Sequence, residues 1–286
     1  MKGIILAAGK GTRLYPMTRP VCKPLLPIYD KPMIYYPLAV LLQAGIRDVL
    51  IITPPDGERD SFEKLLGDGS QLGISISYEI QPVARGIADA LIIGEKFLDG
   101  DDVCLVLGDN LFFSPHFAEK LEQAKENRCG ATIFGYKVED PRAFGVVEFD
   151  ESGNVLSLEE KPQKPKSNYI VPGLYFYDGK AIEIAKGLKP SARGELEITD
   201  VNIEYMRRGE LKVVLLSDDF VWLDAGTADT LVDAAYTIRG IQNETGEYIA
   251  CLEEIAYQMG FITREQMHQV GEQMKTTAYG KYILSK

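Results

Sequence analysis

Leu6-Ala7-Ala8-Gly9-Lys10-Gly11-Thr12-Arg13-Leu14 follows an apolar run at residues 3–6 that is typical of a buried strand. A glycine-rich turn after a strand allows backbone N–H groups to approach phosphate oxygens, because glycine has no Cβ and tolerates a positive φ. The same pattern also fits a tight turn that binds no ligand. It lacks the third glycine of the dinucleotide fingerprint and the Gly-Lys-Ser/Thr end of the Walker loop, so an NAD(P)-dependent oxidoreductase is disfavoured.

The first half of the chain alternates short β-like runs with helical patterns. Strands are expected at residues 3–6, 49–53, 74–80, 103–107 and 131–136, and helices at residues 32–43, 61–66, 87–97 and 117–127. This order favours an α/β fold with a Rossmann-like, mostly parallel (mixed) sheet flanked by helices on both faces.

The second half is organised differently. Residues 145–149, 155–158 and 169–177 predict a small antiparallel β insertion beside that sheet. Helices at 180–186 and 198–208 and strands at 211–216 and 220–223 follow, and the chain is almost all helix after residue 227, with breaks at Gly246, Gly260 and Thr276. We expect a core over residues 1–230 and a C-terminal helical extension over residues 231–286, packed on the core.

Composition narrows the class of protein. The formal net charge of −11 and the lack of a basic stripe argue against a nucleic-acid partner. A cleft with a few cations could still bind a small anionic substrate. The four cysteines form no C-x-x-C pair, which favours reduced core thiols in a cytoplasmic protein. No apolar stretch approaches the length of a membrane span, so no membrane partner is expected.

Two cations accompany the glycine loop. Arg13 closes it, and Lys23 follows ten residues later within Cys22-Lys23-Pro24-Leu25-Leu26-Pro27. A lone lysine is usually a solvated surface residue, but leucines and prolines do not form a solvated face. Together, Arg13 and Lys23 could hold a triphosphate and stabilise charge on a phosphoryl group.

Two aspartates follow predicted strands. Asp109 stands in Gly108-Asp109-Asn110, which ends the run at 103–107, and Asp224 stands in Trp222-Leu223-Asp224-Ala225-Gly226-Thr227. Ligands of open α/β sheets bind at the carboxyl ends of strands, and Mg²⁺ prefers carboxylate and phosphate oxygens. Each aspartate alone also fits a turn or an N-cap. Gln81, at the end of another predicted strand, carries both a donor and an acceptor and could pair with the N3–O4 edge of thymine or uracil.

Three stretches together resemble the start of a sugar nucleotidyltransferase. They are the loop ending in Leu14, then Lys23-Pro24-Leu25-Leu26-Pro27, then Tyr29-Asp30-Lys31-Pro32-Met33-Ile34-Tyr35-Tyr36-Pro37-Leu38. The third stretch is similar to glucose-1-phosphate thymidylyltransferases, and the resemblance extends nearly to the end of the chain, at Tyr279-Gly280-Lys281-Tyr282.

The resemblance implies a role for each matching residue. The implied catalytic residues are Arg13, Lys23 and Asp109, and Mg²⁺ would be held by Asp109 and Asp224. The implied nucleotide-binding residues are Leu6, Ala8, Gly9, Gly11, Thr12, Arg13, Lys23, Gln81, Pro82, Gly86 and Asp109. The sugar phosphate would be bound by Asn110, Gly145, Glu160, Lys161, Val171 and Arg193. From the residues alone, the stretch around Glu160 and Lys161 fits an exposed charged turn equally well. The core would then divide into a nucleotide-binding half, about 1–135, and a sugar-phosphate-binding half, about 136–230.

The implied reaction joins dTTP and α-D-glucose 1-phosphate to give dTDP-glucose and pyrophosphate, the first step of dTDP-rhamnose and deoxysugar synthesis. UTP-glucose-1-phosphate uridylyltransferase is the alternative, because Pro24 stands where many thymidylyl members have Gln and because the loop Val83-Ala84-Arg85 differs from theirs. A non-catalytic sugar-nucleotide sensor is disfavoured, since it would lack one of Lys23, Asp109 and Asp224.

The tail also matches the family, at Glu253-Glu254-Ile255-Ala256-Tyr257. In relatives of this length the tail supports a homotetramer and a second nucleotide site for feedback inhibition. Here Gln258-Met259 replaces the Arg-Lys that often follows. We therefore expect a homotetramer (or dimer), with packing between subunits favoured over regulation as the role of the tail.

Overall fold

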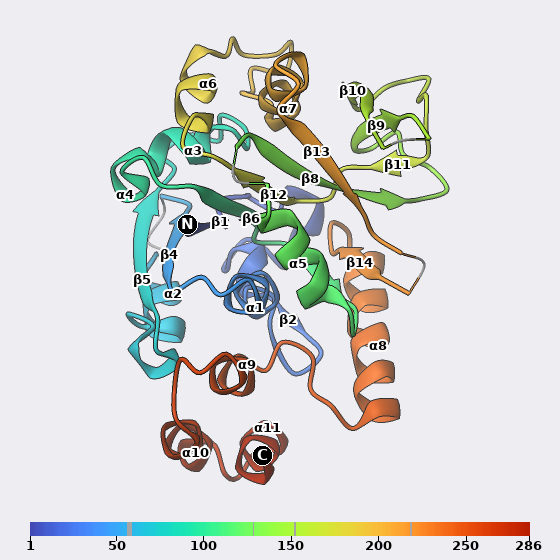
Figure 1. Cartoon of the computed structure of the whole chain (residues 1–286). Coiled ribbons are helices and arrows are strands. Elements are labelled where there is room, and N and C mark those ends of the chain that lie inside the picture. Colours follow the sequence, from blue (N-terminus) through green and yellow to red (C-terminus); the bar gives the residue numbers. More distant parts are fainter. Residues whose placement is uncertain (56–58, 128, 152, 218) are drawn as a thin grey trace. The chain divides into compact units, whose positions relative to one another are not determined.

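A computed structural model describes residues 1–55, 59–127, 129–151, 153–217 and 219–286 (Figure 1). The chain forms two compact units. The first unit comprises Met1–Leu6, Gln81–Leu107 and Phe113–Trp222, and the second comprises Ala7–Ile80, Gly108–Phe112 and Leu223–Lys286. Both units are therefore assembled from segments that are distant in the sequence.

The first unit is built on a mixed sheet. Its strands are β1 (Lys2–Leu6), β6 (Val103–Leu107), β8 (Ala131–Lys137), β9 (Gly145–Phe149), β10 (Val155–Glu160), β11 (Tyr169–Ile170), β12 (Leu174–Tyr177) and β13 (Leu211–Leu215). Strands β1 and β6 pair in parallel, and so do β8 and β13. Strand β12 runs antiparallel between β6 and β8, while β9, β10 and β11 form the antiparallel insertion. The central strands β1, β6 and β12 are mostly apolar and buried, as the runs in the sequence predicted.

Helices of the first unit cover this sheet. They are α3 (Asp89–Ile93), α4 (Glu95–Leu98), α5 (Phe117–Lys125), α6 (Ala181–Gly187) and α7 (Ile198–Arg207). Helix α5 packs against β8 and β13, and α6 packs against α3 and α7 (Figure 1). Two short strands, β7 (Asn110–Phe113) and β14 (Val221–Asp224), lie where the chain passes from one unit to the other.

The second unit contains the parallel pair β4 (Asp48–Thr53) and β5 (Ser75–Ile80) with helices α1 (Tyr35–Gln43) and α2 (Arg59–Leu66). Its short 3₁₀ turns are η1 (Thr12–Leu14), η2 (Lys23–Leu25) and η3 (Ser70–Leu72). Between η2 and α1 the chain makes a small antiparallel hairpin from β2 (Pro27–Ile28) and β3 (Lys31–Pro32). This hairpin begins shortly after η2, which contains Lys23, so its position affects the position of Lys23.

Four C-terminal helices complete the second unit: α8 (Ala228–Thr245), α9 (Leu252–Gln258), α10 (Arg264–Gln273) and α11 (Ala278–Ser285). Helix α8 begins with a capping box between Thr227 and Thr230 and ends at Gly246, which adopts a φ of 74°. Helix α8 contacts β2, α9 contacts α1, and α10 contacts both α9 and α11 (Figure 1). The helical extension thus packs on the N-terminal part of the same unit.

The predicted fold class, a mixed α/β fold with an antiparallel insertion and a helical extension, is confirmed. Two segments differ in detail. The helix expected at 87–97 divides at Gly94 into α3 and α4, in keeping with the low helix propensity of glycine. The strand expected at 169–177 divides into β11 and β12 at Pro172, because proline has no N–H to donate to a neighbouring strand. The proposed division into binding halves stays a prediction.

The structure also tests the expectations of buried thiols and of no membrane span. In the described part of the chain no disulfide joins the four cysteines; Cys22, Cys104 and Cys251 are buried, but Cys129 is exposed and is not the core thiol that was expected. The reason is its place in the turn before β8, after α5 has ended. Among the described residues, no helix combines the length and the apolar character needed to cross a bilayer.

Candidate active site

The glycine loop of the second unit packs directly on Lys23. Gly11 adopts a left-handed φ of 58° at the start of η1, and a Cβ on it would lie 3.1 Å from Cβ of Lys23. The Thr18 hydroxyl donates to the Gly11 carbonyl at 2.7 Å, and this bond fixes the loop. Gly9 has no heavy atom within 4 Å of an added Cβ, so open space borders this end of the loop. Only a residue without a side chain fits at Gly11.

Lys23 joins the two aspartates. It is the first residue of η2 and is 5% exposed, and its neighbours Pro24 and Cys22 are buried as well. Its ammonium Nζ lies 2.6 Å from Oδ2 of Asp109 and 3.7 Å from Oδ1 of Asp224. The lysine is therefore a buried cation between two carboxylates and not a solvated surface residue.

Asp224 carries the perturbed carboxyl of this group. Burial, and then the nearby charge of Asp109, raise its pKa above the ordinary 3.8, while Lys23 and Arg13 act in the opposite direction. Close by, a Cβ on Gly226 would lie 3.1 Å from Nη2 of Arg13 and 3.2 Å from Oδ2 of Asp224. The side chains of Arg13 and Asp224 thus both lie next to Gly226, where the lack of a side chain leaves room for them.

These residues suit a magnesium ion that is shared with a phosphate. Asp109 and Asp224 face one ammonium group, so their oxygens lie close enough together to serve one centre. Mg²⁺ is commonly held by one or two carboxylates together with substrate phosphate oxygens and water. Among the described residues, no cluster of three or more His, Cys, Asp and Glu side chains could form an all-protein metal cage. The donor set therefore fits Mg²⁺ bound together with a nucleotide.

Gln81 lies in the first unit, directly after β5. It is 5% exposed, and its Nε2 donates to Oδ2 of Asp89 at 2.9 Å and to the Gly86 carbonyl at 3.4 Å. Asp89 also pairs with Arg85 at 2.6 Å. The amide nitrogen is thus occupied by protein acceptors, which fixes the orientation of the side chain.

Gly86 ties this loop to a distant segment of the same unit. Its φ is 103°, and a Cβ on it would lie 2.4 Å from the backbone oxygen of Leu196. On either side, the Leu196 amide donates to the Arg85 carbonyl, and the Ala88 amide donates to the Leu196 carbonyl. The predicted base-binding loop is therefore bonded to the chain that carries the predicted sugar-phosphate arginine.

That segment holds a network around Glu160 and Arg193. The guanidinium of Arg193 contacts Glu197 at 2.8 Å and Glu160 at 3.3 Å, and the Thr199 hydroxyl donates to Oε2 of Glu160 at 2.6 Å. Ser191 donates to Glu197 at 2.7 Å. Burial lowers the pKa of Arg193, but the hydrogen bonds to Glu197 and the charges of the nearby carboxylates together raise it, so Arg193 remains a cation throughout the ordinary pH range.

The remaining predicted sugar-phosphate residues surround Glu160, with one exception. Gly145 is its partner across β9 and β10, and the Gly145 carbonyl accepts a hydrogen bond from the Val171 amide. Lys161 adopts a φ of 45° and lies 3.6 Å from Glu160. The exception is Asn110, which belongs to the second unit, where its side chain donates to Asp109 at 3.0 Å.

The structure therefore gathers the predicted residues into two groups. In the second unit these are Gly11, Arg13, Lys23, Asp109, Asn110 and Asp224; in the first unit they are Gln81, Gly86, Gly145, Glu160, Lys161, Val171 and Arg193. Leu6 ends β1, Ala8 is buried, and Thr12 and Pro82 are exposed.

Several functional neighbours were not predicted. Glu197 and Thr199 lie four and six residues after Arg193 in the sequence, and this proximity was a usable signal. Gly226 adjoins Asp224 in the sequence, but nothing there indicated its contact with Arg13. Asp89 carried no signal at all.

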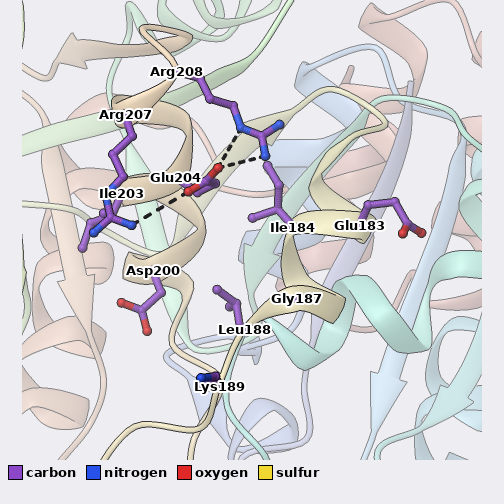
Figure 2. A pocket seen from close by; sticks show the side chains of 10 residues that line it. All are labelled: Glu183, Ile184, Gly187, Leu188, Lys189, Asp200, Ile203, Glu204, Arg207 and Arg208. Atoms are coloured by element: carbon purple, nitrogen blue, oxygen red, sulfur yellow. Dashed lines mark hydrogen bonds and ion pairs between the residues drawn. The ribbon is translucent and has the colours of Figure 1, made fainter.

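A separate pocket of about 530 Å³ opens in the first unit between α6 and α7 (Figure 2). Arg207 and Arg208 border it and pair with Glu204 between them. Its charged lining balances, with Lys189, Arg207 and Arg208 against Glu183, Asp200 and Glu204. It therefore offers no net charge to a phosphate, and none of the predicted site residues lines it.

Comparisons with known proteins agree with these motifs. The sequence model of the family described as nucleotidyl transferase matches residues 2–240. A glucose-1-phosphate thymidylyltransferase from Neisseria gonorrhoeae is 55% identical over 284 residues, which cover 99% of this chain and 98% of that protein.

Solved structures show the same fold. A structure named as a glucose-1-phosphate thymidylyltransferase from Bacillus anthracis, in complex with a sucrose, is 43% identical, with a TM-score of 0.77 over 84% of this chain and 95% of that chain. A UDP-glucose pyrophosphorylase complexed with UDP-glucose is 23% identical, with a TM-score of 0.70 over 84% and 98%, a likeness of fold alone. The family resemblance predicted from the motifs is thus confirmed, and the chain belongs to the nucleotidyl transferase family.

Proposed function

We propose that the protein transfers a thymidylyl group from dTTP to α-D-glucose 1-phosphate, giving dTDP-glucose and pyrophosphate. The single observation that carries this proposal is the placement of Lys23 between Asp109 and Asp224, beside the glycine loop. A buried cation, two carboxylates and a loop of backbone amides are the groups that a bound triphosphate and its metal ion require. The reaction named for the 55% identical relative from Neisseria gonorrhoeae uses the same chemistry.

The nucleotide is assigned to two sets of groups. Arg13, Lys23 and the loop that contains Gly9 and Gly11 would bind the phosphates. Gln81 would read the base through its side-chain oxygen, because its nitrogen already donates to Asp89 and Gly86. That oxygen can accept a hydrogen bond from N3–H of thymine or uracil, whereas N3 of cytosine carries no hydrogen. The orientation of Gln81 therefore suits the N3–H donor of a thymine or uracil nucleotide.

The sugar phosphate is assigned to the network of the first unit. Glu160, oriented by Thr199, would accept hydrogen bonds from sugar hydroxyls, and Arg193 and Lys161 would bind the phosphate. Val171 and Gly145 would form the backbone wall beside them, where a side chain at position 145 would crowd Thr199 and Glu160. Asn110 would add a further contact to the sugar.

The chemistry requires positioning and charge stabilisation. A phosphate oxygen of glucose 1-phosphate attacks the α-phosphorus of dTTP in line with the leaving pyrophosphate, so one P–O bond forms as another breaks. The attacking phosphate is already deprotonated at neutral pH, and no general base is needed. Lys23 and Arg13 would hold the triphosphate and stabilise the charge that develops on it.

Mg²⁺ is the proposed cofactor, and Asp109 and Asp224 are the residues that would hold it. When bound, it supplies a further positive charge to the phosphate oxygens. Lys23 keeps the two carboxylates together and partly offsets the repulsion between them.

The substrates are tested by an assay of pyrophosphate release with glucose 1-phosphate and each of dTTP, UTP, ATP and CTP. We expect turnover with dTTP, dependent on Mg²⁺. UTP-glucose-1-phosphate uridylyltransferase is the alternative activity, since Gln81 could accept from uracil in the same way. A higher kcat/KM for UTP than for dTTP would establish that alternative.

We also propose that the protein assembles as a homotetramer (or dimer) in the cytoplasm. Helix α8 supports assembly, because Val232 and Tyr236 lie one turn apart on it and are 66% and 75% exposed. Light scattering of the purified protein would give the subunit number. A Val232→Asp, Tyr236→Asp variant should reduce that number, and an unchanged mass would remove α8 from the proposed interface.

A further inference from the structure

Gln242, near the end of α8, joins three segments of the second unit. The residue is 6% exposed. Its Nε2 donates to Oδ2 of Asp30 at 3.1 Å, and its Oε1 accepts from Nζ of Lys31 at 3.3 Å and from the Ile249 amide at 3.0 Å. A buried amide held by three hydrogen bonds has a fixed orientation, and losing it would leave buried polar partners unpaired.

Through these hydrogen bonds Gln242 binds Asp30 and Lys31 at the tip of the β2–β3 hairpin. Lys31 is 4% exposed, pairs with Asp30 at 2.5 Å, and lies 5.5 to 5.8 Å from the ring centres of Tyr36, Tyr248 and Tyr279. Burial lowers the pKa of Lys31, and the Asp30 carboxylate opposes that effect. The tip of the hairpin thus carries a buried lysine that is paired with Asp30 and lies near rings of α1, α11 and the segment between α8 and α9.

The base of the same hairpin carries Lys23. The Leu26 amide donates to the Lys23 carbonyl at 3.0 Å, and the Ile34 amide donates to the Pro24 carbonyl at 2.8 Å. Between base and tip, Ile28 pairs with Lys31 across the two strands. Pro27 and Pro32 stiffen these strands further, and Pro24 stiffens η2. A displacement of the tip would therefore be transmitted to Lys23.

The other end of α8 is attached to Asp224. Gly226 donates its amide to the Asp224 carbonyl at 2.7 Å, and the capping box at Thr227 starts the helix immediately afterwards. From Ala228 to Gln242 the helix spans about 21 Å, at 1.5 Å per residue. Helix α8 and the hairpin are thus connected at both ends. At one end Gln242 binds the tip of the hairpin, and at the other Nζ of Lys23 lies 3.7 Å from Oδ1 of Asp224.

We propose that Gln242 is a positioning residue for the transfer reaction and that, through the hairpin and α8, it sets where Lys23 lies relative to Asp224. This inference rests on the proposed function, because it assumes that Lys23 and Asp224 serve the triphosphate. It gives the C-terminal helices a direct part in the reaction within one subunit, beyond packing between subunits.

The test compares Gln242→Ala and Gln242→Glu with Asn243→Ala, whose side chain lies exposed on the same helix. The glutamate variant keeps the shape but cannot donate to Asp30. We expect both Gln242 variants to lose about tenfold or more in kcat, since a small misplacement of a charge-stabilising group has an effect of this order. The KM for glucose 1-phosphate should not change, because its proposed contacts around Arg193 belong to the other unit. Asn243→Ala should match the parent protein.

A double-mutant cycle separates positioning from general destabilisation. If Gln242 acts through Lys23, Gln242→Ala should reduce kcat no further in a Lys23→Ala background, while thermal unfolding still reports its effect on stability. Equal proportional losses of kcat in both backgrounds, or parent-like kcat in folded Gln242→Glu, would overturn the inference. An inactive parent protein with all four nucleotides would instead overturn the proposed function.

Discussion

Oδ2 of Asp109 lies 2.6 Å from Nζ of Lys23, although the two residues are 86 positions apart in the sequence. The contact joins the residue that follows β6 to the first residue of η2. Asp224 approaches the same ammonium from a third part of the chain. The proposed function depends on this arrangement of one cation and two carboxylates.

Replacing Lys23 by alanine should lower kcat by about 10²-fold or more, the effect expected when one charge-stabilising group is lost from a phosphoryl-transfer site. Steady-state pyrophosphate release would measure it. Lys64→Ala is the matched control, since Lys64 is an exposed lysine on α2, outside the proposed site. Near-parent turnover in Lys23→Ala would remove this residue from the catalytic group.

Asp224→Asn should be more stable than the parent at neutral pH in the absence of Mg²⁺, yet far less active. The folded-state pKa of Asp224 is raised, so the folded protein holds this proton more tightly than the unfolded chain does. The associated stability is present below the unfolded pKa and is lost as the pH rises through the folded pKa. The advantage of the variant should therefore shrink as the pH falls toward 3.8. Urea unfolding at several pH values would measure it, and a constant difference would contradict the assignment.

Gly226→Ala should reduce turnover by roughly tenfold, because a methyl group would press on the Arg13 guanidinium and the Asp224 carboxylate and displace catalytic groups by a fraction of an ångström. Gly240→Ala is the control, since no heavy atom lies within 4 Å of a Cβ there. It should leave turnover unchanged and raise the free energy of unfolding by about 1 kcal/mol, the usual gain from alanine over glycine inside a helix. Equal turnover in both variants would show that the space at Gly226 has no catalytic importance.

Glu197→Gln should raise the KM for glucose 1-phosphate by roughly tenfold with a smaller change in kcat, because Arg193 would lose the carboxylate that orients it. Glu195→Gln provides the comparison, since Glu195 lies 3.5 Å from the same guanidinium and makes no hydrogen bond to it that fixes its plane. If the two variants gave the same KM, the orientation of Arg193 by Glu197 would be irrelevant to substrate binding.

Local patterns predicted most of the secondary structure. The apolar runs at 103–107 and 145–149 coincide with β6 and β9, and Gly246 ends α8 as its conformational freedom indicated. Gly11 adopts the positive φ that the loop was expected to need. These features depend on residues that are close together in the sequence, so the sequence contains their signal.

Contacts between distant residues could not be predicted in the same way. Gly86 is glycine because of the Leu196 backbone, and the buried Lys31 depends on Gln242 and on two tyrosines of the tail. The sequence around Gly86 does not indicate Leu196 as its partner, and the sequence around Lys31 does not indicate Gln242. The interleaving of the two units, with residues 81–107 in one and 108–112 in the other, also has no marker in the sequence.

The most direct measurement is pyrophosphate release from glucose 1-phosphate with dTTP, UTP, ATP and CTP in parallel, with and without Mg²⁺. The account predicts turnover that requires Mg²⁺, is highest with dTTP, is lower with UTP, and falls by about 10²-fold or more in Lys23→Ala. Absence of turnover with all four nucleotides would contradict it, and so would turnover that is independent of Lys23.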